Sequence, residues 1–296
     1  MLPSSRKRLL RSILFIPGDR KAIFEKAVDK LESDAVIFDL EDAVGCTSKD
    51  AARENVFKYL AEFKSNKQKE IIVRINSALT PAGKEDLLML KTIKDKVNAI
   101  LLPKVDDTEV IKYCANVLGS KSSNRDLWAM IETAKGVINS DMIAASPQID
   151  ALIFGSNDLT KDLKAKHDAQ RSPLLYSMSK VVVSARAYEK WVIDGVHIDI
   201  ADTAGLVRSC IQGKSLGFDG KSLIHPSQIS AANAHFSPTD DDHMHASKII
   251  DAFRQAQLDG KGVCVVDGKL VENLHADEAQ EIIDIVNAID ARKRGQ

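Results

Sequence analysis

Short apolar runs recur along this chain, and they constrain its fold more than any other feature. Runs such as Ala35-Val-Ile-Phe38 and Ala99-Ile-Leu-Leu102 are continuous rather than alternating. This pattern is typical of strands that are buried on both faces of a parallel sheet. Eight strands are predicted, over Ser12–Ile16, Ala35–Asp39, Ile71–Ile75, Ala99–Leu102, Leu127–Ile131, Ala151–Phe154, Trp191–Ile193 and Gly220–Ile224.

The segments between these strands carry apolar residues at helical spacing. One helix, for example, is predicted between Asp107 as its N-cap and Gly119 as its stop. Eight strand–helix units in one chain predict an α/β fold, the (β/α)8 TIM barrel. A doubly wound open sheet is the alternative, although no Gly-x-Gly-x-x-Gly follows the first strand, which weakens a dinucleotide-binding version of it.

The alternation stops near residue 237. Beyond it we predict a helix over Asp240–Gln257, a short hairpin around the Asp267-Gly268 turn and a last helix over about Asp277–Arg292. This tail is too small for a stable domain of its own. We therefore expect a catalytic barrel over residues 1–237 and a lid-like C-terminal extension over 238–296, which packs on the barrel or on a neighbouring subunit.

Composition excludes several classes of protein. The 296 residues include 41 Lys and Arg against 42 Asp and Glu, and this balance argues against a broad nucleic-acid surface. No charge-free apolar stretch reaches 18 residues, so a membrane span is not expected. The four cysteines are scattered, which indicates a reducing compartment. We expect the cytoplasm, and the basic, acid-free start over residues 1–11 leaves the mitochondrial matrix as the alternative.

Polar residues gather where the predicted strands end. In a barrel these positions share one mouth, at the carboxyl ends of the strands. Loops of this kind often begin with helix-capping acids, so each residue alone means little. The coincidence over five successive strand ends predicts a site, and its candidates are Asp39, Glu41, Asp42, Arg74, Lys104, Glu132 and Asp158.

Glu132 and Asp158 form the best candidate metal pair, since they follow neighbouring strands. Two carboxylates, completed by water and substrate oxygens, suit Mg²⁺, which keeps part of its hydration shell. The alternative is that both acids are helix caps, or ion-pair partners of Lys135 and Lys161.

Arg74 ends an apolar run and could bind a substrate carboxylate through two hydrogen bonds. Its alternative is a buried ion pair with Glu41 or Asp42. The acids Asp39, Glu41 and Asp42 could polarise a substrate, act as a base or orient Arg74.

Seven motifs in order resemble one known family, the citrate lyase beta-subunit-like family of the HpcH/HpaI aldolase superfamily, which includes citramalyl-CoA and malyl-CoA lyases. The resemblance runs from about residue 11 to residue 275. Its motifs are Arg11-Ser-Ile-Leu-Phe-Ile-Pro-Gly18, Asp34-Ala-Val-Ile-Phe-Asp-Leu-Glu-Asp-Ala-Val44, Val73-Arg-Ile-Asn76, Leu102-Pro-Lys-Val105, Ile131-Glu-Thr-Ala-Lys-Gly136, Phe154-Gly-Ser-Asn-Asp-Leu159 and Gly217-Phe-Asp-Gly-Lys-Ser-Leu-Ile-His-Pro226.

The resemblance implies a TIM barrel and a Mg²⁺-dependent carbon–carbon lyase, with Mn²⁺ as a possible substitute. Its substrate would be an acyl-CoA thioester, cleaved to acetyl-CoA and a 2-oxo acid, and its assembly a homotrimer or a hexamer. The family's metal ligands map onto Glu132 and Asp158, its substrate-binding arginine onto Arg74, and Glu41 is the nearest match to an acid that contacts substrate.

We assign the remaining candidates from the same mouth. Asp39 and Lys104 are expected to contact substrate, and Asp42 to take part in catalysis. Related CoA-thioester lyases often carry a lid Asp that reaches a neighbouring subunit's site. Here the corresponding stretch is Gly268-Lys-Leu-Val-Glu272-Asn273, so Glu272 keeps the carboxylate with one more methylene and is the expected catalytic residue of the lid.

Three other functions stay open. The chain could be the beta subunit of a multi-subunit citrate lyase that acts on an acyl-carrier-protein thioester, or a CoA-free aldolase of simple 2-oxo acids. A non-catalytic CoA-binding protein is disfavoured, because Arg74, Glu132 and Asp158 are all present.

Overall fold

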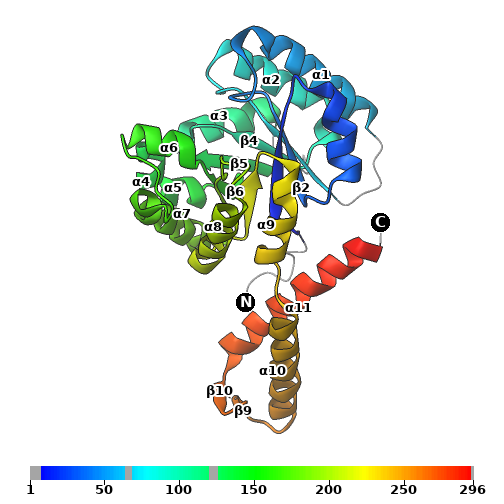
Figure 1. The fold of residues 1–296 in the computed structure, drawn as a ribbon, viewed down its shortest axis with the longest axis vertical. Coiled ribbons are helices and arrows are strands. Elements are labelled where there is room, and N and C mark those ends of the chain that lie inside the picture. The colour runs from blue at the N-terminus through cyan, green and yellow to red at the C-terminus, as the bar shows by residue number, and fades with distance from the viewer. Residues whose placement is uncertain (1–7, 64–68, 120–125, 295–296) are drawn as a thin grey trace. The chain divides into compact units, whose positions relative to one another are not determined.

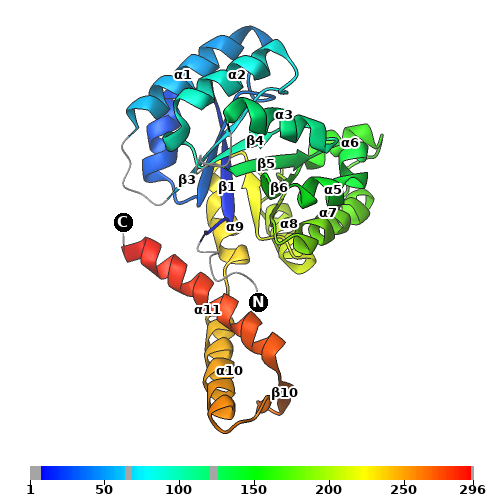
Figure 2. The same ribbon diagram turned by 180° about the vertical axis from the view of Figure 1, so that it is seen from behind.

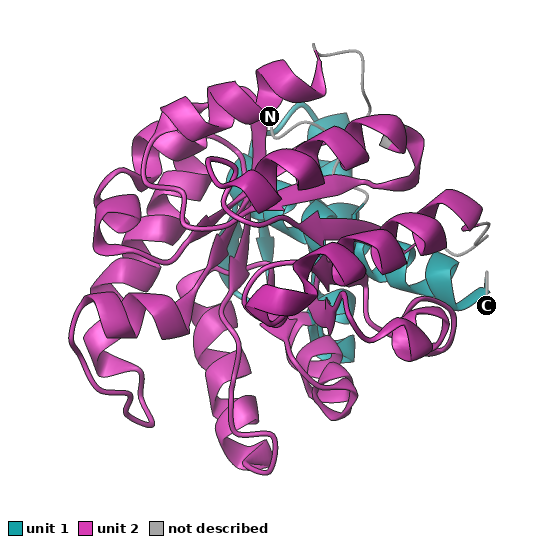
Figure 3. Ribbon diagram, turned by 90° about the horizontal axis from the view of Figure 1, so that it is seen from above, with its two compact units in different colours: residues 1–9, 237–296 teal, residues 10–236 magenta. Residues whose placement is uncertain are grey.

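A computed structural model describes residues 8–63, 69–119 and 126–294. They form two compact units (Figure 3), of which the first is Leu10–Phe236 and the second contains residues 237–294 with residues 8 and 9. Most of the basic N-terminal segment, residues 1–7, lies outside the described residues. The lid function of the C-terminal extension stays a prediction.

The first unit is a closed barrel of eight parallel strands (Figure 1), which confirms the TIM barrel and excludes the open sheet. The first strand closes the ring by pairing with the eighth, with Ile13 opposite Ser222. The predicted strands match the observed ones to within two residues at either end. The strands are β1 (Ser12–Pro17), β2 (Ala35–Asp39), β3 (Glu70–Arg74), β4 (Ala99–Leu102), β5 (Asp126–Ile131), β6 (Ile149–Phe154), β7 (Trp191–Asp194) and β8 (Gly220–Leu223).

Helices surround the strands in every view of this unit (Figures 2 and 3). Between β1 and β2 the chain makes only a 3-10 turn (Lys21–Ile23) and one π-helical turn (Lys26–Lys30). The predicted caps Asp107 and Gly119 bound α3 as expected. The helices are α1 (Lys49–Glu62), α2 (Pro81–Thr92), α3 (Thr108–Leu118), α4 (Ala134–Ile138), α5 (Ser140–Ala145), α6 (Ser156–Asp162), α7 (Leu175–Ala187), α8 (Thr203–Leu216) and α9 (Ile229–Phe236).

The strands separate two apolar layers, because successive side chains point to opposite faces. One layer fills the barrel and includes Ile37, Ile72 and Met130, while the residues next to them pack outward against the helices. Apolar residues on both faces account for the continuous apolar runs. Two residues beyond these three inward positions lie Asp39, Arg74 and Glu132, so the strand alternation directs all three toward the mouth.

The second unit is the predicted helix, hairpin and helix. Helix α10 (Asp240–Leu258) is followed by the antiparallel strands β9 (Cys264–Val266) and β10 (Lys269–Val271) and by α11 (Asn273–Arg294), which begins four residues earlier than predicted. A small core of its own includes Ile249, Phe253 and Val266. Among the helices of the described residues, none combines the length and hydropathy that a bilayer span requires.

Candidate functional site

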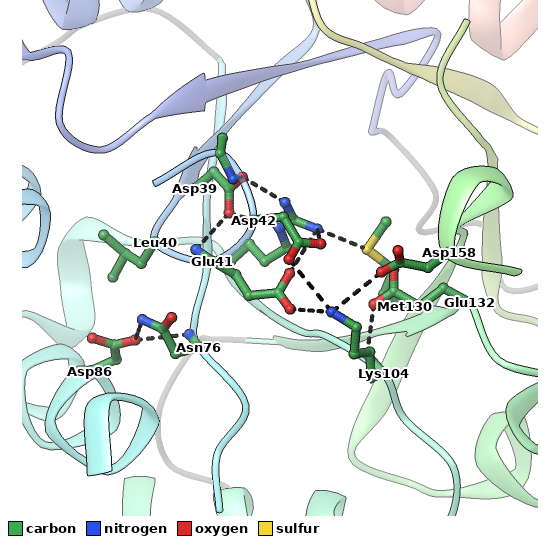
Figure 4. Close-up of polar contacts among 12 residues, drawn as sticks. Asp39, Leu40, Glu41, Asp42, Asn76, Asp86, Lys104, Met130, Glu132 and Asp158 are labelled. Carbon is green, nitrogen blue, oxygen red and sulfur yellow. Dashed lines mark hydrogen bonds and ion pairs between the residues drawn. The ribbon is translucent and has the colours of Figure 1, made fainter. Parts of the chain in front are cut away.

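The mouth of the barrel brings together all the predicted site residues of the first unit. Figure 4 shows the acids of the loop after β2 facing Lys104 from the loop after β4, with Glu132 and Asp158 on its other side. They come from the ends of five successive strands, β2 to β6, which a TIM barrel brings to one mouth. The described residues of this mouth therefore form one charged cluster, which we call the mouth cluster: Asp39, Glu41, Asp42, Arg74, Lys104, Glu132 and Asp158.

Arg74 is held by Asp39 in a two-point ion pair. Its Nε lies 2.7 Å from Asp39 Oδ1 and its Nη2 lies 2.6 Å from Asp39 Oδ2, and both side chains are almost fully buried. The same two oxygens accept the backbone N–H groups of Glu41 and Ala43. Each Asp39 oxygen thus accepts two hydrogen bonds, which argues against the predicted substrate contact and makes Asp39 the residue that orients Arg74.

Apolar groups lie beneath Arg74, and the sequence analysis did not identify them. The Phe15 ring lies 4.9 Å from the guanidinium carbon, and Met130 Sδ lies 3.6 Å from Nη1. Both are inward-facing strand residues, so the two-residue period of β1 and β5 was the signal that could have identified them. Burial alone would lower the pKa of Arg74, but Asp39 outweighs it and keeps that pKa above its usual value.

Glu41 lies between the two cations of the mouth. Its Oε1 is 2.6 Å from Lys104 Nζ, and its Oε2 is 3.1 Å from Arg74 Nη1. Asp42 is more distant, at 3.5 Å from Lys104 and 3.9 Å from Arg74. The predicted ion pairs of Arg74 are therefore present. Burial nevertheless raises the pKa of Glu41 above its usual value, against the lowering effect of Arg74 and Lys104.

Lys104 joins the two sides of the cluster through an uncommon backbone conformation. Its φ is 49°, in the left-handed region that non-glycine residues rarely occupy. Its N–H donates to Glu132 Oε1 at 2.8 Å, and its Nζ lies 3.3 Å from Asp158 Oδ2. One residue thus contacts Glu41, Glu132 and Asp158.

Glu132 is buried against the end of the next strand. A Cβ on Gly155 would lie 2.3 Å from Glu132 Cβ and 2.8 Å from Oε2, so only glycine allows this close approach. Burial raises the pKa of Glu132 to about 7, although Arg74 lowers it. Asp158 lies in the first turn of α6, and its buried Oδ2 accepts no hydrogen bond from the part of the chain that the structure describes.

These two acids fit a divalent cation. The ion-pair alternative named Lys135 and Lys161, but Lys135 pairs with Asp107, and Asp158 contacts Lys104. Both acids offer hard oxygen ligands, and Asp158 Oδ2 receives no hydrogen bond from the described segments. Within the described ranges, no cluster of three or more His, Cys, Asp or Glu residues could hold a metal alone. A pair of carboxylates suits Mg²⁺, which retains water ligands.

Glu272 belongs to the second unit, where it joins β10 to α11. Its N–H donates to Nδ1 of His275 at 3.1 Å, and its carboxylate follows the hairpin in the predicted place. Its action on a neighbouring subunit stays a prediction.

Several curated proteins resemble this chain over almost its whole length. A (3S)-malyl-CoA thioesterase of Cereibacter sphaeroides is 40% identical over 281 residues, which cover 95% of this chain and 96% of the relative. The human mitochondrial citramalyl-CoA lyase is 31% identical, over 94% of this chain and 86% of the relative. A citrate lyase subunit beta of Leuconostoc mesenteroides is 32% identical, over 96% and 95%.

Solved structures show the same architecture. The protein CitE of Mycobacterium tuberculosis, in complex with magnesium, acetoacetate and coenzyme A, has a TM-score of 0.75 and 26% identity, over 93% of this chain and 97% of that one. A citrate lyase beta subunit from the same organism, with oxaloacetate and magnesium, has a TM-score of 0.67 and 28% identity, over 78% and 99%.

A family model described as HpcH/HpaI aldolase/citrate lyase matches residues 11–226. The match covers the barrel and every residue of the mouth cluster. Together with the relatives above, it confirms the predicted fold, the predicted family and the expectation of a carbon–carbon lyase. The chain belongs to the HpcH/HpaI aldolase/citrate lyase family.

Proposed function

We propose that this protein cleaves a 3-hydroxy-acyl-CoA thioester, of the citramalyl-CoA or malyl-CoA type, into acetyl-CoA and a 2-oxo acid with the help of Mg²⁺. One observation carries the proposal: the buried, permanently charged Arg74 and the acid pair Glu132 and Asp158 share one barrel mouth, where Glu41 and Lys104 connect them. The names of the relatives, and the magnesium in the similar structures, support it.

Arg74 would bind the carboxylate of the substrate. Asp39 fixes one edge of its guanidinium and leaves Nη1 on the side of Glu41. A fixed, desolvated guanidinium binds a carboxylate more strongly than a mobile surface group does, because less conformational freedom is lost on binding. The same contact would hold the 2-oxo acid as it forms.

Glu132 and Asp158 would hold the cation, either Mg²⁺ or Mn²⁺. When bound, such a cation polarises the hydroxyl and carboxylate oxygens of the substrate. The protein's own part is to supply two oxygen ligands from neighbouring strand ends and to keep them in place. Gly155 lets Glu132 approach β6, and the Lys104 N–H fixes one Glu132 oxygen.

Glu41 would accept the proton of the substrate hydroxyl. Its raised pKa suits a proton acceptor near neutral pH. As the hydroxyl becomes a carbonyl, the carbon–carbon bond breaks and its electron pair passes to the methylene carbon of the thioester. The ammonium of Lys104 faces the negative charge of this enolate, and Glu272 of the partner subunit would protonate it to acetyl-CoA. This step requires an oligomer, which we propose to be a homotrimer or a hexamer.

A product assay tests the proposal. Citramalyl-CoA and malyl-CoA are each incubated with the protein in Mg²⁺ and in EDTA, and acetyl-CoA and the 2-oxo acid are quantified. We expect turnover in Mg²⁺ and loss in EDTA or in Glu132→Gln. The exposed Glu109 of α3, which pairs with Lys112, supplies the control Glu109→Gln. Full activity in EDTA would refute the metal assignment.

Thioester hydrolysis is the second candidate, favoured by the 40% identity to a (3S)-malyl-CoA thioesterase. Hydrolysis releases free CoA and a dicarboxylic acid, whereas cleavage releases acetyl-CoA. The same assay separates them when free thiol is measured beside acetyl-CoA. Turnover of a citryl-carrier thioester only with copurifying subunits would instead indicate the citrate lyase beta subunit, and turnover of free acids without CoA would indicate the aldolase.

A further inference from the structure

We propose that Lys49 and Arg53, one turn apart on α1, are positioning residues that hold the two loops on either side of the Glu41–Arg74 contact. The inference rests on the proposed function, because it assigns a role to the placement of Glu41 and Arg74. Neither residue belongs to the mouth cluster, and neither was a candidate of the sequence analysis.

Lys49 binds the main chain of the loop that carries Glu41. Its Nζ donates to the carbonyl oxygen of Leu40 at 2.9 Å and to that of Glu41 at 2.6 Å. From the other side, Asp39 accepts the N–H of Glu41. The peptide groups on both sides of the Glu41 Cα are therefore bound to charged side chains. These are charge-assisted bonds to main chain, so they fix where the Glu41 side chain starts.

Arg53 secures the loop after Arg74 through one intermediate carboxylate. Its Nε donates to Asp86 Oδ1 at 2.6 Å. The other oxygen of Asp86, which is fully buried, accepts both the backbone N–H and the side-chain amide of Asn76, each at 2.8 Å. Figure 4 shows the Asn76 amide and the Asp86 carboxylate on the same side of the view as Leu40 of the loop after β2. Asn76 lies two residues beyond Arg74, so this chain of contacts holds the end of β3.

The close approach of α2 completes this support. A Cβ on Gly83 would lie 2.1 Å from the carbonyl oxygen of Ser77 and 2.6 Å from that of Asn76. The first turn of α2 therefore packs directly against the loop after β3. The Nη2 of Arg53 also donates to the carbonyl oxygen of Ala82, at 3.3 Å. Helix α1 thus contacts one loop directly and the other through α2.

The four-residue spacing of Lys49 and Arg53 explains why one helix can support both the loop after β2 and the loop after β3. Residues i and i+4 lie on one face of a helix, so Lys49 and Arg53 point the same way from α1. Lys58 of the same helix differs, because it is exposed and pairs with Glu54 one turn before it. It offers a matched control for the loss of a lysine from α1.

The experiment compares Lys49→Met with Lys58→Met and Lys49→Arg in two measurements. The first is kcat and KM for the thioester that the wild type cleaves. Misplacing a reacting group by about 1 Å can cost about 100-fold in rate. We expect kcat of Lys49→Met to fall by about 10- to 100-fold with KM little changed, partial recovery in Lys49→Arg, and no change in Lys58→Met.

The second measurement is hydrogen–deuterium exchange of the backbone amides of residues 40–44, and it does not depend on any activity. Four of these amides have acceptors: that of Leu40 donates to Arg74 O, those of Glu41 and Ala43 to Asp39, and that of Val44 to Glu41 O. Lys49→Met should speed their exchange about fivefold or more, whereas Lys58→Met should leave it unchanged. The variant Arg53→Lys keeps the positive charge but loses the several N–H donors of the guanidinium. In this variant the backbone amide of Asn76 should exchange faster.

Exchange at residues 40–44 that stays at the wild-type rate in Lys49→Met would overturn the inference, whatever the activity. An equal fall of kcat in Lys49→Met and Lys58→Met would also overturn it. If the wild type cleaves neither thioester while Lys49→Met still speeds this exchange, the proposed function fails and the positioning role stands.

Discussion

Two charged clusters lie at strand ends of this barrel, and they differ in how completely the protein neutralises them. In the mouth cluster, Arg74 and Lys104 face five carboxylates. In the second cluster, Arg171 and Lys221 both bind the carboxylate of Asp194, at 2.7 Å each. The first has an excess of acid at an open mouth, and the second is buried between the sheet and its helices.

The buried cluster is satisfied by the protein itself. Lys221 also donates to the Gly195 carbonyl at 2.6 Å, and Arg171 donates to Gln212 and to the Ser209 carbonyl of α8. Burial would raise the pKa of Asp194, but its two cations outweigh this and lower it.

In the mouth cluster the pKa values shift the other way, because burial raises those of Glu41 and Glu132, and within the described residues no hydrogen bond reaches Asp158 Oδ2. Acids with raised pKa values that gather at one barrel mouth are typical of functional sites, whereas acids fully paired with cations are typical of structural ion pairs.

The largest expected effect is on the buried cluster. Asp194→Ala leaves the fully buried Lys221 and the partly buried Arg171 without a counter-charge, and such a loss costs about 3–5 kcal/mol of the free energy of unfolding. Urea denaturation measures it. The exposed Asp141, which lies 3.6 Å from Lys180, gives the control Asp141→Ala, with an expected loss below about 1 kcal/mol. Equal losses in the two variants would contradict the structural role of the cluster around Asp194.

The mouth cluster should respond in the opposite way. Asp158→Asn removes one of several crowded negative charges, so the free energy of unfolding should stay within about 1 kcal/mol of the wild type or rise. Its lyase turnover should fall at least about 100-fold, because a metal ligand is lost. Urea denaturation and the product assay are run on the same preparation. A variant that is both unstable and active would contradict the assignment.

A smaller effect concerns pH. The pKa of Glu132 is about 7, so a proton competes with the cation for this carboxylate below that value. Affinity for Mg²⁺ should therefore be about tenfold weaker at pH 6 than at pH 8. Isothermal titration calorimetry measures it, with Glu132→Gln as the control in which this dependence disappears. Equal affinity of the wild type at both pH values would contradict the raised pKa of Glu132 in the metal-free site.

The contrast also shows how far the sequence alone could lead. The eight apolar runs predicted a parallel sheet covered on both faces, and the closed strand order of the structure then separated the barrel from the open sheet. The strand ends were sufficient to identify every residue of the mouth cluster. Its position at a strand end alone would also have placed Asp194 at the mouth, but Asp194 is one residue past the inward Ile193, so its side chain faces α8.

Other features needed the fold. Asp39 and Arg74 are 35 residues apart, and only the pairing of β2 with β3 puts them side by side and decides that Asp39 orients the arginine. The same holds for Lys49, whose partners are main-chain carbonyls that no sequence pattern marks. Contacts with backbone and close approaches such as Gly155 against Glu132 leave little trace in a single sequence.

The most direct measurement is the position of a bound cation. Crystals grown with Mn²⁺ and a 2-oxo acid would be measured at a wavelength where manganese scatters anomalously. The account predicts one strong peak at the barrel mouth, within about 2.3 Å of carboxylate oxygens of both Glu132 and Asp158, with the acid's carboxylate on Arg74. A mouth without a peak, or a peak away from these two acids, would contradict the account.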